Sequence, residues 1–308
     1  MHRLKNWQLL AICVLTWGTT WYVITFQIGA APPEVSVALR FGLAGAVVLA
    51  MCALRGVSLR FTVREHARLA LQGGFMYGLS YLCVYHAERH VVSGLVAVGY
   101  SASPLVSGLG ARLLFGTRVT QRFLFGGLLG LVGVALIFWP EFSKAAYGVG
   151  GAVSGNVALG AGFTVVSVLL SGVGSLTASR NRAHGLPFWP ALGIGMVYGA
   201  ALCAVVALLL GQRLAPPAVA SWWAALLYLS LAGSVLTFAC FLTLQERIGP
   251  GPAGAVGVLT PLLALLVSIG FERFRPDALT LLGAGLAVLG NVLILRPARA
   301  QRRAASPV

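Results

Sequence analysis

The sequence predicts an all-α integral membrane protein with ten transmembrane helices, arranged as two inverted five-helix repeats. Three observations lead to this prediction: an apolar composition, ten apolar segments of spanning length, and an internal repeat. The chain has 308 residues, of which 58% are hydrophobic and only 9% are charged, and its mean hydropathy is +0.88. A soluble domain of this size carries about a quarter charged residues, so these values favour the lipid bilayer as the solvent of this chain.

Ten segments approach the length of about 20 mostly apolar residues that a transmembrane helix needs. They cover residues 7–28, 35–54, 69–87, 91–114, 122–139, 156–178, 187–210, 218–243, 250–271 and 278–295. The first is interpreted as a retained helix, because it is longer than the core of a signal peptide and lacks an A-x-A cleavage site. The connections leave no room for a soluble domain. The expected organisation is a first repeat at 1–140, a linker at 141–155, a second repeat at 156–296 and a basic cytoplasmic tail at 297–308.

Lysine and arginine residues are divided unequally between the two sides of this topology. Sixteen of the 22 fall on the side of the termini and five on the opposite side, while Arg40 lies inside a span. Because short cytoplasmic loops carry an excess of Lys and Arg, this distribution predicts that both termini are cytoplasmic. The net charge of +15 is spread over these flanks without a basic helix or arm, so it indicates the lipid bilayer as a partner and not nucleic acid.

An internal repeat links the two halves. Glu88 begins a Glu-Arg pair that is followed sixteen residues later by Pro104, and Glu246 begins another that is followed fifteen residues later by Pro261. After each proline come an apolar helix, a short polar turn and a closing helix. The closing helices carry glycine pairs at equal spacing, Gly126 and Gly133 in the first half and Gly283 and Gly290 in the second. Five spans per half make the repeats inverted, an architecture that places the substrate near the midplane and predicts alternating access.

Several stretches resemble the EamA-type transporters of the drug/metabolite transporter superfamily, in an order that extends the resemblance over nearly the whole chain. They are Trp17-Gly18-Thr19-Thr20, Ala38-Leu39-Arg40-Phe41, the run from Ser101 to Ile137, and ERIGPGPAGAVGVLTPLLALL followed by Glu272-Arg273. The resemblance implies a bacterial inner-membrane transporter that exports small organic solutes, commonly amino acids or related metabolites. The sixth span departs from the family, which often carries a Trp there, so a substrate group that meets that Trp would lack its partner. This chain has Phe163, Ser167, Ser171 and Gly172 instead.

Pro104 and Pro261 interrupt two spans at matching places. Proline lacks an N–H and clashes with the carbonyl four residues before it, which frees the carbonyls of Tyr100 and Gly257. In lipid such groups need a partner. The two prolines are therefore either hinges at a buried, wet site or static kinks.

Aromatic and hydroxyl side chains form the predicted substrate site. Trp17 and Trp21 share one helix face with Thr20 beside them, and three tyrosines of the third span repeat every four residues. A phenol at mid-membrane needs a hydrogen-bond partner, which indicates a wet cavity, with interhelical packing as the alternative. The candidate substrate-binding residues are Trp17, Thr20, Tyr77, Tyr81, Tyr100, Ser103, Ser167, Ser171 and Thr260.

Arg40 is the only formal charge well inside a span, which makes it a candidate for a gate or for a structural charge. Its possible partners are Glu34, His86 and Glu88. All seven acids lie at or beyond the span ends, so no mid-membrane carboxylate is predicted for proton relay. The sequence therefore favours a facilitator or exchanger that runs down the solute gradient. His86 near Glu88 is the one titratable pair left for coupling.

Other function classes lack the residues that they require. A small multidrug pump uses an intramembrane Glu, a nucleotide-sugar carrier needs cations that face its cavity, and an intramembrane enzyme needs a nucleophile with a base, paired aspartates or a metal set. The five Cys residues lie in apolar runs without a C-x-x-C pair, so no metal and no cofactor is expected. The leading hypothesis is a monomeric exporter of amino acids, including apolar and aromatic ones. A proton-coupled drug/metabolite efflux pump is the alternative, and an intramembrane enzyme is the least favoured.

Overall fold

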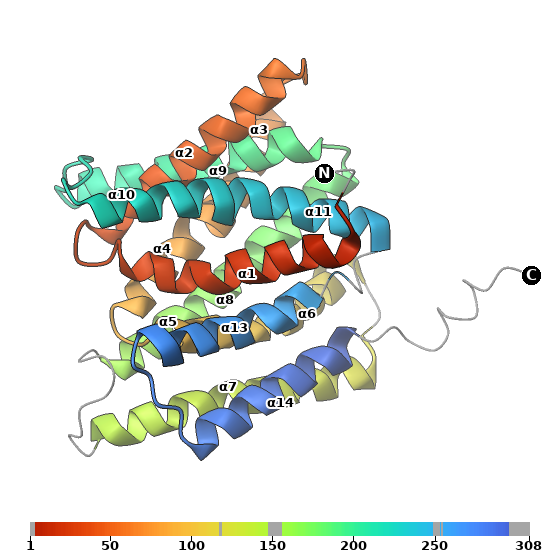
Figure 1. Ribbon diagram of the computed structural model, residues 1–308. Coiled ribbons are helices and arrows are strands. Elements are labelled where there is room, and N and C mark those ends of the chain that lie inside the picture. Colours follow the sequence, from red (N-terminus) through yellow and green to blue (C-terminus); the bar gives the residue numbers. More distant parts are fainter. Residues whose placement is uncertain (1–3, 117–118, 147–155, 249–252, 254, 296–308) are drawn as a thin grey trace, which may run out of the picture.

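Ten membrane-crossing helical segments make up the fold, as the sequence predicts (Figure 1). The structure is a computed structural model that describes residues 4–116, 119–146, 156–248, 253 and 255–295. Over these residues the regular elements are helices, apart from one isolated bridge between Ile28 and Ala31. Eight of the described helices are long and apolar enough to cross a membrane, and Ala255–Phe271 is a shorter apolar helix.

Three of the crossings consist of several helical elements in direct succession. In the first half the elements are α1 (Asn6–Thr25), α2 (Pro33–Leu54), α3 (Val63–Gly73), η1 (Gly74–Leu79), α4 (Ser80–Glu88), α5 (Ser93–Gly99), η2 (Tyr100–Ala102), α6 (Ser103–Phe115) and α7 (Gln121–Ala146). In the second half they are α8 (Val157–Ala183), α9 (Phe188–Leu209), α10 (Ala220–Leu227), η3 (Tyr228–Leu236), α11 (Thr237–Ile248), α13 (Ala255–Phe271) and α14 (Ala278–Leu295). The third crossing is α3–η1–α4, the fourth is α5–η2–α6, and the eighth is α10–η3–α11.

Some helices run beyond the apolar segments that the sequence indicates. α3 begins at Val63 because Thr62 and Glu65 form a capping box, in which the Thr62 N–H donates to the Glu65 carboxylate at 2.7 Å. α7 continues through Pro140 to Ala146, so the first part of the predicted linker is helical. Hydropathy does not register such polar helix ends. The rest of the linker, 147–155, and the tail, 297–308, lie outside the described residues.

The third and eighth crossings share a π-helical stretch at mid-length. It is η1 in the third crossing and η3 in the eighth. In a π-helix each hydrogen bond spans five residues instead of four, and such turns are often found at functional sites. In η3, Ser234 Oγ donates to Leu229 O at 2.9 Å, and Thr237 Oγ1 donates to Ala232 O at 2.7 Å. These hydroxyls satisfy backbone carbonyls that lipid could not.

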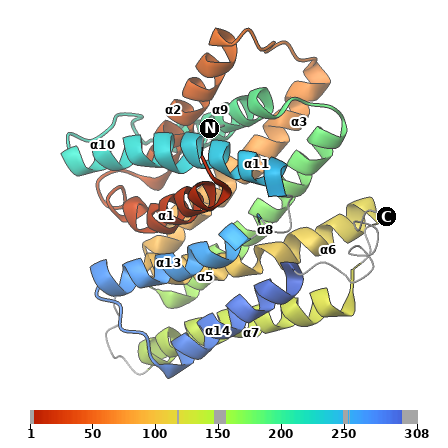
Figure 2. The ribbon, with the colours of Figure 1, turned by 45° about the vertical axis from the view of Figure 1, so that its right-hand side comes forward.

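Helices of the two halves pack against each other throughout the bundle. α2 packs on α9 and α7 packs on α14, whereas α1 contacts α11 and α13, and α8 contacts α4 and α6. Both views show α7 with α14 at one edge of the bundle and α2 with α9 towards the opposite edge (Figures 1 and 2). The middle is left to α1, α4, α5, α8 and α13, and the site described below lies there.

Glycines bring α7 and α14 into backbone contact. A Cβ atom at Gly133 would lie 2.5 Å from Gly283 O, and one at Gly290 would lie 2.4 Å from Gly126 O. Small residues permit such close approach between helices in a membrane. The equal spacing of the two glycine pairs in the sequence therefore corresponds to an antiparallel crossing, in which the first glycine of one pair meets the second of the other.

The two faces of the bundle can be distinguished by the chain ends. α1 begins and α14 ends on one face, which we call the terminal side (Figure 1). The connections that follow α1, α4, α9 and α13 lie on the opposite face, which we call the far side.

Candidate functional site

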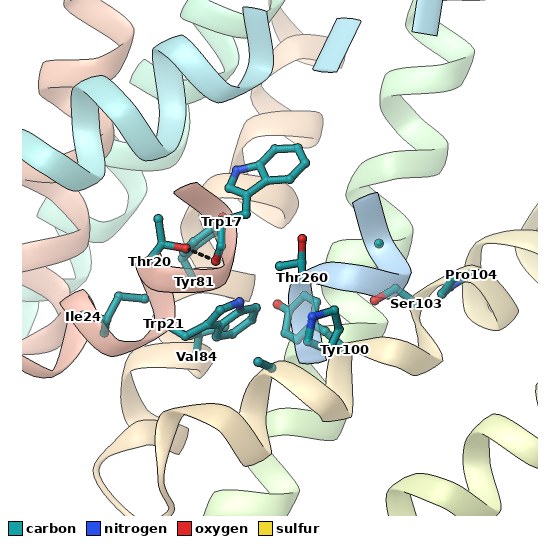
Figure 3. A pocket seen from close by; sticks show the side chains of 13 residues that line it. Trp17, Thr20, Trp21, Ile24, Tyr81, Val84, Tyr100, Ser103, Pro104 and Thr260 are labelled. Atoms are coloured by element: carbon teal, nitrogen blue, oxygen red, sulfur yellow. Dashed lines mark hydrogen bonds between the residues drawn. The ribbon is translucent and has the colours of Figure 1, made fainter. Parts of the chain in front are cut away.

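A cavity of ≈ 260 Å³ lies in the middle of the bundle, between α1, α4, the α5–η2–α6 segment and α13 (Figure 3). We call it the central pocket. Its volume is close to the lower end of the range for small-molecule sites, about 300 Å³. It is lined by Trp17, Thr20, Trp21, Ile24, Tyr81, Val84, Ala97, Tyr100, Ser103, Pro104, Gly257, Thr260 and Pro261.

Aromatic rings form much of the pocket wall. Trp17 is fixed by its indole N–H, which donates to Gly233 O at 3.0 Å in the π-helical η3. The rings of Trp21 and Tyr100 pack with their centroids 5.1 Å apart. Tyr81 turns one face to the Arg40 guanidinium, whose carbon lies 4.7 Å from the ring centroid. These rings suit apolar or aromatic parts of a ligand.

Two hydroxyls in the pocket wall have no hydrogen-bond partner in the part of the chain that the structure describes. Ser103 Oγ and Thr260 Oγ1 are buried and form no hydrogen bond with any described residue, although both residues line the pocket. By contrast, Thr20 Oγ1 donates to Trp17 O at 2.7 Å within its own helix (dashed in Figure 3). Buried hydroxyls in proteins are almost always hydrogen-bonded. These two are therefore the groups that a polar ligand or a bound water would satisfy.

Both predicted hinge prolines line the central pocket, but their local structures differ. Pro104 lies in the first turn of α6, directly after the 3₁₀ turn η2. Pro261 lies inside the continuous helix α13. A proline at the start of a helix costs little, whereas one in the interior removes a backbone hydrogen bond. The helix of the fourth crossing is thus interrupted next to Pro104, whereas the helix of the ninth crossing, α13, continues without interruption past Pro261.

Ser167 and Ser171 are not among the residues that line the central pocket. Ser167 is fully buried, its hydroxyl donates to Ser80 O at 2.9 Å, and it forms a short hydrogen bond with the Tyr100 hydroxyl. The same Tyr100 hydroxyl lies 2.9 Å from Ser80 Oγ. This triad of hydroxyls ties α8 to α4 and orients the Tyr100 ring, which is on the wall.

Tyr77 also lies away from the central pocket, because it lines a second cavity of ≈ 70 Å³ towards the terminal side. Phe238 of α11 lines that cavity as well, and its ring centroid lies 5.4 Å from that of Trp17. Phe238 therefore stands between the two cavities. Sequence reasoning missed it, since a single Phe in an apolar span carries no signal that distinguishes a cavity wall from a lipid-facing position.

Arg40 is fully buried behind the pocket wall rather than in it. Its Nη1 donates to the Tyr85 hydroxyl at 3.5 Å, its guanidinium lies over Phe41 and Tyr81, and its Nε has no partner among the described residues. Aromatic faces stabilise a desolvated guanidinium. Among the described residues, Arg40 forms no ion pair with Glu34, His86 or Glu88, its possible partners.

Instead, His86 and Glu34 pair with each other on the far side, with His86 Nε2 3.0 Å from Glu34 Oε1. Gln212 donates to the other oxygen of Glu34 at 3.1 Å. In the connection after α4, partial burial and the nearby Arg89 lower the pKa of His90. A neutral imidazole agrees with His90 Nδ1 accepting a hydrogen bond from the Asn156 N–H at 3.3 Å.

Glu88 differs from the sequence expectation of an exposed or interfacial acid. It is the last residue of α4, as predicted, but only 6% of it is exposed, and neither carboxylate oxygen has a hydrogen-bond partner among the described residues. Position in the sequence could not reveal this burial, because a residue at a span end is buried or exposed according to the neighbours that the fold brings to it. Across the described residues, no cluster of three or more His, Cys, Asp or Glu side chains could hold a metal ion.

Known proteins resemble this chain over almost its whole length. The sequence profile of the EamA-like transporter family matches it twice, at residues 6–139 and 158–296. An uncharacterized inner membrane transporter of Escherichia coli strain K12, YedA, is 27% identical over 288 residues, which cover 93% of this chain and 89% of YedA. Protein PecM of Dickeya dadantii is 26% identical over 269 residues, covering 87% of this chain and 84% of PecM. A solved crystal structure shares the fold with a TM-score of 0.65 at 22% identity, covering 97% of this chain and 98% of that one.

Proposed function

The chain belongs to the EamA-like transporter family, and from this premise we propose that it exports small zwitterionic solutes, most favourably amino acids with apolar or aromatic side chains. Membership makes it a multi-pass inner-membrane transporter of the drug/metabolite transporter superfamily, with a small-molecule substrate bound within the membrane. The choice of amino acids goes beyond membership and depends on the central pocket.

The observation that carries this proposal is the contrast within the pocket wall. Four aromatic rings offer an apolar surface, while Ser103 Oγ and Thr260 Oγ1 offer two unsatisfied hydroxyls on facing segments, α6 and α13. A ligand with a polar head and an apolar side chain satisfies both. The wall carries no formal charge, which disfavours phosphorylated ligands, because these are ordinarily held by Arg or Lys.

Alternating access is the proposed mechanism, with the two halves as inverted repeats. The helix packing supports this mechanism. Each crossing of the first half has a counterpart five crossings later in the second half, and the main contacts stay the same when every crossing is replaced by its counterpart. The α1–α13 contact exchanges with the α8–α6 contact, and the α2–α9 and α7–α14 pairs each exchange with themselves. The two matches of one family profile, at 6–139 and 158–296, agree with this duplication. Pro104 and Pro261, which face one pocket, are the proposed hinges.

The excess of Lys and Arg on the terminal side supports an orientation in which both termini are cytoplasmic and the far side faces outward. We further propose that one chain is the transporting unit, since a single chain encloses the whole pocket. From the sequence, we propose a facilitator or exchanger that runs down the solute gradient, and the alternative is a proton-coupled drug/metabolite efflux pump. Turnover of a solute by purified protein without compartments would instead point to an intramembrane enzyme.

The test is counterflow in proteoliposomes with a panel of labelled amino acids. We expect exchange of apolar or aromatic amino acids, and loss of that exchange in Trp17→Ala. Trp139→Ala is the matched control, because Trp139 is 62% exposed on α7 and does not line the pocket. Exchange of another metabolite without exchange of any amino acid would contradict the proposed substrate class. An equal loss of exchange in Trp17→Ala and Trp139→Ala would contradict the assignment of the pocket as the binding site.

The two unpartnered hydroxyls allow a sharper experiment. Ser103→Ala and Thr260→Val remove groups that form no protein hydrogen bond, so protein stability should not fall. If the hydroxyls bind substrate, each change should raise KM by about 5- to 10-fold, the equivalent of about 1 kcal/mol per hydrogen bond. Thr164→Val is the control, since this buried hydroxyl already donates to Gly160 O at 2.8 Å. The control should lose stability at an unchanged KM.

A further inference from the structure

On the far side, a group of hydroxyls and one carboxylate joins α5 to the end of α13. We call it the far-side latch, and it consists of Ser93, Ser268 and Glu272. The Ser93 N–H and hydroxyl donate to the two oxygens of Glu272 at 3.2 Å and 2.6 Å, and Ser268 Oγ forms a short hydrogen bond with Glu272. Ser268 Oγ also accepts from the Gly94 N–H at 2.9 Å. Because α5 and α13 belong to different halves, the latch closes the bundle on this side.

Glycine makes this junction tight. A Cβ atom at Gly94 would lie 2.7 Å from Ser268 Oγ and 3.0 Å from Leu265 Cα. The helices could not approach this closely with a larger residue at that position. α5 and α13 therefore leave no gap at this junction, and an opening between them towards the far side would have to part the latch.

Glu88 is near this latch and differs from Glu34, Glu272 and Asp277, three other acids of the far side. Glu34 has His86 and Gln212, Glu272 has Ser93 and Ser268, and Asp277 has the Thr280 N–H at 2.9 Å. Glu88 is 6% exposed and has no partner for either oxygen among the described residues. A buried carboxylate without donors is costly as an anion, whereas the neutral acid avoids most of that cost.

The charged groups around Glu88 do not reverse this conclusion. The Glu272 carboxylate is close enough to act on Glu88 electrostatically and disfavours a second negative charge. Arg40 of α2 acts in the opposite direction, but it forms no ion pair with Glu88 and lies instead over Tyr81 and Phe41. Tyr85, on the same helix, directs its hydroxyl to Gln27 at 2.7 Å. α5 contains no ionisable residue.

We propose that Glu88 is a proton-binding site of the transport cycle, which takes up a proton from water of the far side before the far-side latch closes and gives it up to the central pocket when the pocket opens to the terminal side. Closing the latch over an ionised Glu88 would bury a second, unpaired negative charge next to Glu272, so closure follows protonation. In this step a hydronium ion of the outside water gives its proton to a Glu88 carboxylate oxygen and becomes water, so that one O–H bond breaks as the other forms. This inference rests on the proposed transport function and replaces the passive exchanger that the sequence favours with a coupled one.

The position of Glu88 also gives the proton a second route. Val84 lies one helical turn before Glu88 on α4 and lines the central pocket. When the pocket opens to the terminal side, its water is therefore about 6 Å along the helix from the proton site, since the two residues are four positions apart. Release there, after uptake outside, would carry one proton inward for each solute exported.

The protonation itself can be tested without a substrate. Infrared spectra of the reconstituted wild-type protein at neutral pH should show the carbonyl stretch of a buried, protonated carboxylic acid. The band should disappear in Glu88→Gln, which has the shape of the neutral acid, and should persist in His86→Ala and Glu272→Gln. Absence of the band from the wild type, or its loss in His86→Ala rather than in Glu88→Gln, overturns the proposal.

Coupling is tested in proteoliposomes with an acidic interior, using the amino acid that gives the largest counterflow in the panel. The wild type should accumulate it as protons leave. Glu88→Gln should lose this accumulation but still respond to a solute gradient, and His86→Ala should keep it. The inference is overturned if Glu88→Gln still accumulates the amino acid, or if this variant responds to neither the proton gradient nor the solute gradient. It is also overturned if the wild type does not respond to the proton gradient. If no solute exchanges at all, the proposed function fails, while the infrared result still decides the protonation of Glu88.

Discussion

The third and eighth crossings have the same backbone design but different side chains. Each is broken at mid-length by π-helix, at η1 in one and η3 in the other, and each ends near a Glu-Arg pair. The third carries Tyr77, Tyr81 and Tyr85, whereas the eighth has Val235, Ala239 and Thr243 at the same distances from its glutamate. Duplication has kept the helix geometry, and the side chains have diverged.

As a result of this divergence, the two halves contribute differently to the central pocket. Ten of its thirteen lining residues come from the first half, and only Gly257, Thr260 and Pro261 come from the second. The eighth crossing contributes a backbone carbonyl, Gly233 O, which holds the Trp17 indole. The first half thus supplies most of the pocket wall, and the second half helps to position it. Substitutions in the two π-helical crossings should accordingly have different consequences.

The largest effect is expected for Gly73→Ala in the third crossing. A Cβ atom there would lie 2.0 Å from Gly195 O and 2.7 Å from Gly195 C, on the backbone of α9. Backbone atoms cannot move aside as a side chain can, so we expect a loss of about 3 kcal/mol or more in stability. Thermal unfolding of the detergent-purified protein measures this loss. Gly162→Ala is the control, because nothing lies within 4 Å of its Cβ position, and its stability should be unchanged or slightly higher. Equal melting temperatures of the two variants would contradict the close backbone packing of the end of α3 on α9.

A smaller and repairable effect is expected at Gly233 in the eighth crossing. A Cβ atom there would lie 2.7 Å from Cγ2 of Thr20, a side-chain methyl group. Gly233→Ala should therefore lower the free energy of unfolding by about 1 to 2 kcal/mol. It should also disturb the hydrogen bond between the Trp17 indole and Gly233 O. Thr20→Ser removes the clashing methyl group and keeps the hydroxyl, so the double variant should regain most of the loss. A double-mutant cycle on thermal stability and KM measures the coupling, and strictly additive effects would contradict this contact.

Much of the fold and part of the candidate site could be predicted from sequence. Ten crossings follow from hydropathy, and the repeated proline and the Trp17 face indicate residues that do line one pocket. The prediction of Ser167, Ser171 and Tyr77 as wall residues does not agree with that lining, because periodicity gives the face of a helix but not the neighbour that it meets. Ser167 meets Tyr100 and Ser80 instead. The burial of Glu88 and the nearness of the Glu272 carboxylate, 184 positions away in the chain, likewise depend on tertiary packing that no local pattern encodes.

The smallest expected effect separates the three tyrosines of the third crossing from one another. Tyr85 is fully buried, and its hydroxyl donates to Gln27 Oε1 at 2.7 Å while Arg40 Nη1 lies 3.5 Å from it. Tyr85→Phe leaves a buried amide oxygen unpaired and should lower stability by about 1 kcal/mol. Because Tyr85 does not line the pocket, KM should stay unchanged, unlike the rise expected for the wall hydroxyls. Tyr22→Phe is the matched control, since that ring packs on Phe26 and Phe271 through its faces and edges, and its stability should not change. A raised KM in Tyr85→Phe at full stability would place this tyrosine with Tyr81 on the binding surface, and would extend that surface towards Arg40.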